Sequence, residues 1–190
     1  MRASKRDELV RKALEVYYRD GFHATGMDRL VAETGVSKTS MYKHFRTKED
    51  LILAVLRLRD ENFRNWLYRR MEELETTPEG QLLASFDALG EWFSQEGFRG
   101  CMFVKAGAEF QEKGHPIHAQ ASEHKRLLAE HYTALAEAAG ARQPELLARQ
   151  LLILKEGAIA GAVLLNGAEA ARDAKAAARI IMKAALPKMA

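Results

Sequence analysis

A run of cationic and hydroxyl side chains between residues 37 and 48 is the part of this sequence best equipped for chemistry with a partner. Four lysines or arginines fall in this run, and no carboxylate does. Ammonium, hydroxyl and imidazole groups can donate hydrogen bonds to phosphate oxygens and to the edges of bases. An ordinary solvated charged face is the alternative. The side chains predicted to face the major groove of DNA are Lys38, Thr39, Ser40, Lys43 and His44, with Tyr42 and Lys48 on phosphates.

These side chains need a short helix to present them, and the surrounding residues predict one. Gly35 can adopt the positive φ that ends a helix sharply, and Ser37 can cap the helix that follows. Met41 and Phe45 lie four residues apart, so they share the face opposite the cations and should point into a core. Because apolar residues at 30–32 predict a preceding helix, the order is that of a helix-turn-helix.

Six short motifs extend this pattern over about the first 55 residues. They are Gly21-Phe22, Thr25-x-Met27, Leu30-x-Ala32, Gly35-Val36-Ser37, Tyr42-x-x-Phe45 and Lys48-x-x-Leu51. As a set they resemble the N-terminal domain of the TetR-like one-component transcriptional regulators. The resemblance implies a helix-turn-helix DNA-binding domain over residues 1–50 and a helical effector-binding and dimerisation domain over residues 51–190. It also implies a homodimer that binds double-stranded DNA at a palindromic operator.

Three further residues are expected to contact the DNA. Arg2 and Lys5 belong to a basic N-terminal tail of the kind that touches the DNA backbone or a minor groove, although a solvated tip is the alternative. Thr25 begins a Thr-x-x-Asp sequence with Asp28, which is the spacing of a capping box at a helix start. The resemblance implies that Thr25 also holds a phosphate at that helix start.

The distribution of charge supports a nucleic-acid partner for the first part of the chain. Residues 1–50 hold 11 Lys or Arg and 8 Asp or Glu, whereas residues 51–190 hold 18 of each. The whole net charge of +3 therefore lies in the segment that carries the helix-turn-helix. One cysteine, no apolar N-terminal run and no apolar stretch long enough for a membrane span predict a cytoplasmic protein.

The composition predicts an all-α fold of about nine helices. Alanine, leucine, glutamate, lysine and arginine dominate, and there are four prolines. After the helix-turn-helix, a long helix from Lys48 to about Glu75 should connect the two domains. The other expected helices cover residues 4–20, 25–34, 77–96, 101–113, 117–139, 144–165 and 168–186.

The last two expected helices are suited to dimerisation, which the resemblance also implies. Gly157 and Gly161 lie four residues apart, and such small residues let two helices approach closely. Packing inside one subunit is the alternative. The predicted interface residues are Leu151, Leu154, Ala158, Gly161, Ala162, Leu165, Ala177, Ile180, Ile181 and Ala184.

Aromatic and methionine side chains in the middle of the chain could line a cavity for a small-molecule effector. A closed hydrophobic core is the alternative, and the resemblance favours the cavity. Such walls would suit a hydrophobic or aromatic ligand, with His124 or Gln111 as a polar anchor. The predicted lining residues are Phe63, Trp66, Phe86, Phe93, Met102, Phe103, Phe110, His124 and Leu128.

Metal, cofactor and enzyme functions are not expected. The spacing of His115, His118, His124 and His131 is poor for a shared metal ion. There is no phosphate-cradling glycine loop and no nucleophile motif. The sequence therefore predicts a homodimeric repressor whose effector shifts the long connecting helix. The alternatives are an activator of the same fold, or a helical interaction module whose basic helix binds an acidic protein partner.

Overall fold

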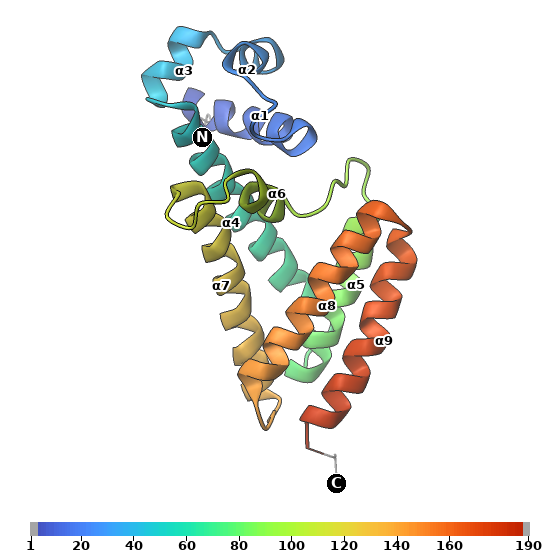
Figure 1. Cartoon of the computed structure of the whole chain (residues 1–190). Helices are drawn as coiled ribbons and strands as arrows, with labels where there is room; N and C mark the ends of the chain where they lie inside the picture. The colour runs from blue at the N-terminus through green and yellow to red at the C-terminus, as the bar shows by residue number, and fades with distance from the viewer. Residues whose placement is uncertain (1–3, 188–190) are drawn as a thin grey trace. The chain divides into compact units, whose positions relative to one another are not determined.

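The computed structural model describes residues 4–187, and this part of the chain is all-α, as predicted. It contains nine helices and no strand (Figure 1). The helices are α1 (Lys5–Asp20), α2 (Met27–Thr34), α3 (Lys38–His44), α4 (Lys48–Leu74), α5 (Pro78–Phe93), α6 (Met102–Glu109), α7 (Pro116–Ala138), α8 (Pro144–Leu164) and α9 (Gly167–Ala185).

Local capping residues explain where several of these helices begin. At the start of α4, the Asp50 N–H donates to Thr47 Oγ1 at 3.1 Å and the Thr47 N–H donates to Asp50 Oδ2 at 3.0 Å. This reciprocal pair is a capping box, and it fixes the start of α4 at Lys48. Thr77 Oγ1 accepts from the Gly80 N–H at 3.1 Å, and Pro78 occupies the first turn of α5. Both predicted helix starts are therefore confirmed.

Two helices are shorter than expected. Helix α5 ends at Phe93 rather than near Glu96, and α6 ends at Glu109 rather than at Lys113. At Phe110 the backbone leaves the helical region, with φ −117° and ψ 78°, and the aromatic ring turns into a core. The gain from burying that ring explains why α6 stops before the glycine and proline that follow.

The chain divides into two compact units by its internal contacts. Unit 1 comprises the residues up to Phe63 together with Cys101–His124. Unit 2 comprises Arg64–Gly100 and the residues from Lys125 onward. Helices α4 and α7 each contribute to both units. The described part of the expected DNA-binding segment, residues 4–50, belongs to unit 1.

The core of unit 1 joins helices that are distant in the sequence. Leu9, Tyr17 and Phe22 from the first helix and its turn are fully buried, with Leu30 of α2. The same cluster takes in side chains from α4, α6 and the first part of α7, including Ile52, Phe103 and Ile117. Large buried side chains of this kind contribute about 1.5–3 kcal/mol each. Helices α1 to α3 therefore share one hydrophobic core with α6.

In unit 2, α8 and α9 run side by side as an antiparallel pair, and α5 packs against both (Figure 1). A Cβ added at Gly161 would lie 3.3 Å from the Cβ of Ala170, so this glycine permits the close approach that was predicted. Gly157 has no neighbouring atom within 4 Å of such a Cβ. Gly157 faces outward and makes no such contact within the subunit, so its part in dimerisation stays a prediction.

No helix among residues 4–187 combines the length and apolar character needed to cross a membrane.

Candidate nucleic-acid interface

The turn between α2 and α3 is held by local hydrogen bonds. Gly35 has φ +69°, and its N–H donates to Val31 O at 3.0 Å. Ser37 Oγ accepts from the Ser40 N–H at 3.2 Å, which confirms the predicted cap of α3. Thr34 adds a contact that the sequence did not reveal, because its buried hydroxyl donates to Leu30 O at 2.6 Å and accepts from Val36 N–H at 3.2 Å. These bonds fix the angle between the two helices.

Helix α3 has the two faces that the sequence predicted. Met41 is 1% exposed and Phe45 is 7% exposed, so both anchor the helix to the core of unit 1. Arg6 of α1 also lies over the Phe45 ring, 5.0 Å from its centroid. On the opposite face Ser40 is half-buried, and the exposed side chains are Lys38, Thr39, Tyr42, Lys43 and His44. A seven-residue helix thus offers an acid-free polar surface on a rigid support.

Two of the candidate lysines are influenced by neighbouring carboxylates. Lys38 Nζ lies 3.1 Å from Asp28 Oδ1, and this hydrogen bond raises the pKa of Lys38. Both partners are exposed, so the pair is weak and another acceptor can replace the carboxylate. Burial lowers the pKa of Lys48 at the start of α4, while the charges of Glu109 and Glu49 oppose that shift.

Thr25 does not play the predicted role. Gly26 is the N-cap of α2 and no side chain caps this helix, so the predicted capping box with Asp28 is wrong. The Thr25 side chain is fully buried, and its hydroxyl donates to Gly21 O at 2.7 Å. A buried hydroxyl committed to the backbone cannot reach a DNA phosphate. Thr25 instead holds together the turn between α1 and α2.

Of the two residues of the expected basic tail, only Lys5 lies in the described part of the chain. Lys5 is the first residue of α1 and its side chain is exposed. Arg2 lies outside the residues that the structure describes.

Glu109 anchors the turn between α1 and α2 to α6, which sequence reasoning missed. Its carboxylate accepts the Phe22 N–H at 3.0 and 3.1 Å and the His23 N–H at 2.5 Å. The His23 ring nitrogen Nε2 lies 2.8 Å from the Glu109 carbonyl oxygen. A carboxylate that accepts backbone N–H groups makes stronger hydrogen bonds than a neutral acceptor does. The pairing joins residues 86 or 87 positions apart, and no local pattern could have revealed it.

The candidate ligand-lining residues of unit 1 are all buried. His124 is 1% exposed, and its Nδ1 lies 2.7 Å from Asp60 Oδ1. Its ring stacks on Phe103 with centroids 3.7 Å apart and meets the edge of Phe63 at 5.9 Å. Phe110 lies 4.6 Å from His23, centroid to centroid. Met102 is also buried in this cluster. Gln111, the other polar anchor considered, is exposed.

The remaining lining candidates belong to unit 2. Phe86, Phe93 and Leu128 are buried, and Trp66 is half-buried. The nine candidates are therefore divided between the two units. Whether they line a cavity stays a prediction.

Helices α8 and α9 expose several apolar side chains, but these differ in part from those predicted. Leu151 and Ala158 are 0% and 5% exposed, so they pack inside the subunit because they lie on the inner face of α8. Leu165 and Ile180 are 87% and 74% exposed, and Ala184 is exposed as well. The other predicted residues, Leu154, Gly161, Ala162, Ala177 and Ile181, are half-buried.

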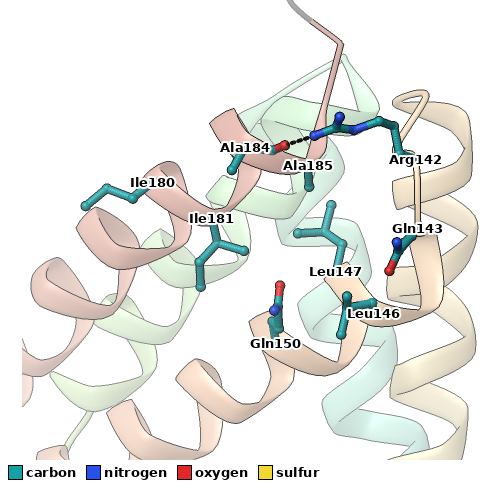
Figure 2. A pocket seen from close by; sticks show the side chains of 9 residues that line it. All are labelled: Arg142, Gln143, Leu146, Leu147, Gln150, Ile180, Ile181, Ala184 and Ala185. Atoms are coloured by element: carbon teal, nitrogen blue, oxygen red, sulfur yellow. Dashed lines mark hydrogen bonds between the residues drawn. The ribbon is translucent and has the colours of Figure 1, made fainter.

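The sequence reasoning also missed exposed side chains on this face, namely Leu146, Ile153 and Leu164. They recur at intervals of seven or eleven residues along α8, which places them on one side of the helix. Between the ends of α8 and α9 lies a groove of about 600 Å³, with Leu146, Gln150 and Ile181 projecting into it (Figure 2). Arg142 closes one end by donating to Ala184 O.

No cluster of three or more histidine, cysteine, aspartate or glutamate side chains suited to a metal occurs within residues 4–187.

The fold and the α2–α3 geometry define the class of protein: an all-α, helix-turn-helix DNA-binding protein. The family model described as "Bacterial regulatory proteins, tetR family" matches residues 9–55. The chain is 24% identical over 169 residues to the HTH-type transcriptional regulator YjdC of Escherichia coli, covering 89% of this chain and 88% of that one.

Two solved structures extend the similarity to the whole chain. SCO4454, a TetR-family transcriptional regulator from Streptomyces coelicolor, is 28% identical, with 95% of each chain covered and a TM-score of 0.88. A putative TetR transcriptional regulator from Streptomyces avermitilis is 30% identical, with 96% of this chain and 98% of that chain covered and a TM-score of 0.84. The chain belongs to the TetR family of DNA-binding transcriptional regulators, and members of this family are not enzymes.

Proposed function

We propose that the protein is a homodimeric repressor that places α3 in the major groove of a palindromic operator and leaves the DNA when a small molecule binds. The observation that carries the proposal is the exposed, acid-free face of α3, anchored from behind by buried Met41 and Phe45. A short cationic helix on a rigid support is the reading element of helix-turn-helix proteins.

The proposed contacts follow from exposure and side-chain chemistry. Hydroxyl and amine groups on the outer face of α3 read base edges, and this set is Lys38, Thr39, Ser40, Lys43 and His44. Tyr42, Lys48 and Lys5 bind phosphates, which fixes the position of α3 on the duplex. Arg2 is also proposed to bind a phosphate, on the basis of the sequence alone. Thr25 is not among the proposed phosphate-binding residues because its side chain is buried.

The homodimer is proposed to form through the outer face of α8 and α9. This face exposes large apolar side chains, and water contact with them is unfavourable. The residues proposed for the interface are all exposed, and only some of them were predicted from the sequence. They are Leu146, Ile153, Leu164, Leu165, Ile180 and Ala184. Two copies of α3 placed about 34 Å apart, or a multiple of it, would fit two half-sites on one side of a duplex.

The effector is proposed to act by favouring a conformation in which the two α3 helices no longer match the operator. Helix α4 belongs to both units, so it is the proposed transmitting element. Couplings between two sites are typically about 1–3 kcal/mol, which corresponds to a change in DNA affinity of roughly 5- to 150-fold. The protein is proposed to act in the cytoplasm, where its DNA would be.

The DNA contacts can be tested on duplexes selected by the purified protein from a random-sequence pool. Affinity is measured by fluorescence anisotropy over a series of salt concentrations. The double variant Tyr42→Ala/Lys48→Ala should lose at least about 100-fold in affinity, because two phosphate contacts are removed. The matched control Lys113→Ala removes an exposed cation from the α6–α7 loop of the same unit, and it should bind as the wild type does.

The same titrations separate the proposed repressor from the alternatives. A specific DNA-binding protein should show a palindromic consensus and a steep loss of affinity with salt. Selection of no consensus, or equal binding by the double variant, would contradict the assignment of α3. A reporter gene placed behind the selected site then distinguishes repression from activation.

A further inference from the structure

The groove between the ends of α8 and α9 has the size and the lining of a small-molecule site. Its volume of about 600 Å³ falls within the range of about 300–1,000 Å³ that is usual for such sites. Its wall is mostly apolar, with Leu146 and Leu147 from α8 and Ile180 and Ile181 from α9 (Figure 2). Leu146 and Ile180 are exposed, so an apolar group bound here would remove large hydrophobic side chains from water. Every lining residue belongs to unit 2.

Arg142 is the one charged side chain in the lining of this groove. Its Nη2 donates to Ala184 O, which leaves Nε and Nη1 able to donate to another group. Arg142 forms no ion pair with a carboxylate of residues 4–187. The nearest carboxylate along the chain, Glu145, lines a different hollow, between α7 and α8. One end of an apolar groove therefore carries a positive charge that no carboxylate in the described chain balances.

The two helix ends beside Arg142 also favour an anion at this position. Helix α8 begins here, and its N-cap residue Gln143 provides no side-chain cap, so N–H groups of the first turn need acceptors. This end of α8 is the positive end of its dipole. At the carboxyl end of α9, the oxygens of Ala184 and Ala185 would repel an anion, but both accept hydrogen bonds from Arg142. An anionic group here meets the guanidinium and the start of α8 together.

We propose that this groove binds a single-chain amphiphile with an anionic head. The head lies beside Arg142, and the apolar chain lies between α8 and α9 against Leu146 and Ile181. Leu146, Ile180 and Ala184 are also proposed for the dimer interface, so a bound amphiphile and a second copy of the chain exclude each other. The amphiphile therefore weakens dimerisation. This regulatory effect rests on the proposed function, because it requires the dimer, whereas binding to the groove does not.

The test compares octanoate with its uncharged counterpart, octan-1-ol, on the full-length protein. Each is added up to about 2 mM, and binding is measured by calorimetry and by NMR of the isoleucine δ1-methyl groups. The chain has six isoleucines, of which Ile180 and Ile181 line the groove. Their signals should shift most. Octanoate should bind about two- to fivefold more tightly than octan-1-ol at low salt, and the difference should shrink as salt screens the exposed Arg142.

Three variants examine the groove directly. Arg142→Met should remove the preference for octanoate over octan-1-ol, whereas Arg142→Lys keeps the charge and should retain part of the preference. Ala184→Trp places a large side chain in the groove at an exposed position and should abolish binding of both compounds. The matched control is Arg179→Met, which removes an exposed arginine of α9 that does not line the groove. It should bind both compounds as the wild type does.

A monomeric variant separates binding from dimerisation. Ile153 is exposed on α8 outside the groove, and Ile153→Glu is expected to be a monomer. This variant should bind octanoate at least as tightly as the wild type, because no second copy competes for the groove. In the wild type, sedimentation velocity should show a smaller dimer fraction as octanoate is added. Acetate at the same concentration has the charge without the apolar chain and should leave the dimer fraction unchanged.

The site is overturned if the largest methyl shifts lie at isoleucines outside the groove, if neither the wild type nor Ile153→Glu binds octanoate, or if Arg142→Met keeps the preference for octanoate. An occupied groove in a dimer that octanoate does not weaken would overturn the competition. An occupied groove in a wild-type protein that is monomeric without octanoate would support the site and overturn the dimer of the proposed function, so the two failures are distinguishable.

Discussion

Removal of the Glu109 carboxylate should loosen the turn between α1 and α2. Two backbone N–H groups, those of Phe22 and His23, donate to this carboxylate. A hydrogen bond to a charged group contributes about 1.5–3 kcal/mol. Because the His23 amide is exposed and can turn to water, we expect Glu109→Ala to lower the free energy of unfolding by about 2–3 kcal/mol in total.

This loss of unfolding free energy should be measurable as a fall in Tm. In a chain of 190 residues, each kcal/mol shifts Tm by about 2–4 °C, so Tm should fall by about 5–10 °C. Glu109→Gln keeps one acceptor oxygen without the charge and should lose about half as much. Scanning calorimetry measures Tm, and hydrogen exchange followed by NMR measures protection at the Phe22 and His23 amides.

The control is Glu112→Ala, which removes an exposed carboxylate from the loop that follows α6. It should leave Tm and the two amides unchanged. If Glu109→Ala melted with the wild type and the Phe22 amide kept its protection, the carboxylate would not be the anchor, and the argument for it would fail.

Three further predictions concern other parts of the chain. Ile153→Glu and Ile180→Glu should each convert the proposed dimer into a folded monomer, because the buried interface would then hold an unpaired charge. Light scattering after size exclusion measures the mass. A variant that remains dimeric would contradict the proposed interface. Thr25→Val should lower Tm by removing the bond to Gly21 O yet leave the affinity of the remaining folded protein for DNA unchanged; a tenfold loss of affinity would restore the phosphate role. Burial lowers the pKa of His131 below 6.5 in the folded protein, so the unfolded chain takes up a proton first as the pH falls. The free energy of unfolding should therefore decrease as the pH drops through 6.5. His131→Gln should make the free energy of unfolding less dependent on pH in this range, and urea titrations at several pH values measure it.

Local patterns were sufficient to predict the helix-turn-helix. The glycine at 35, the cap at 37 and the apolar pair at 41 and 45 each act within one or two helical turns, and all three behave as expected. The predicted capping role of Thr25 was wrong because it was based on residue spacing alone. A capping spacing can be read from sequence, but burial of the hydroxyl depends on the turn before it.

Features that depend on distant contacts could not be predicted. The Glu109 carboxylate meets the α1–α2 turn across more than 80 residues, and the His124–Asp60 pair spans 64. On α8 the apolar residues lie all around the helix, so hydrophobicity alone could not say whether Leu151 or Ile153 faces outward.

The Lys38–Asp28 ion pair must open before Lys38 can make its proposed contact with DNA. Most surface lysines release a condensed counterion from the duplex when they meet a phosphate, and each such contact steepens the dependence of affinity on salt by about 0.9 in logarithmic slope. In the proposed complex Lys38 would instead exchange the Asp28 carboxylate for the edge of a base, and the exposed carboxylate would then lie beside the DNA. Replacement of Asp28 by asparagine would therefore tighten the complex most at low ionic strength, at the expense of discrimination between operator and random DNA.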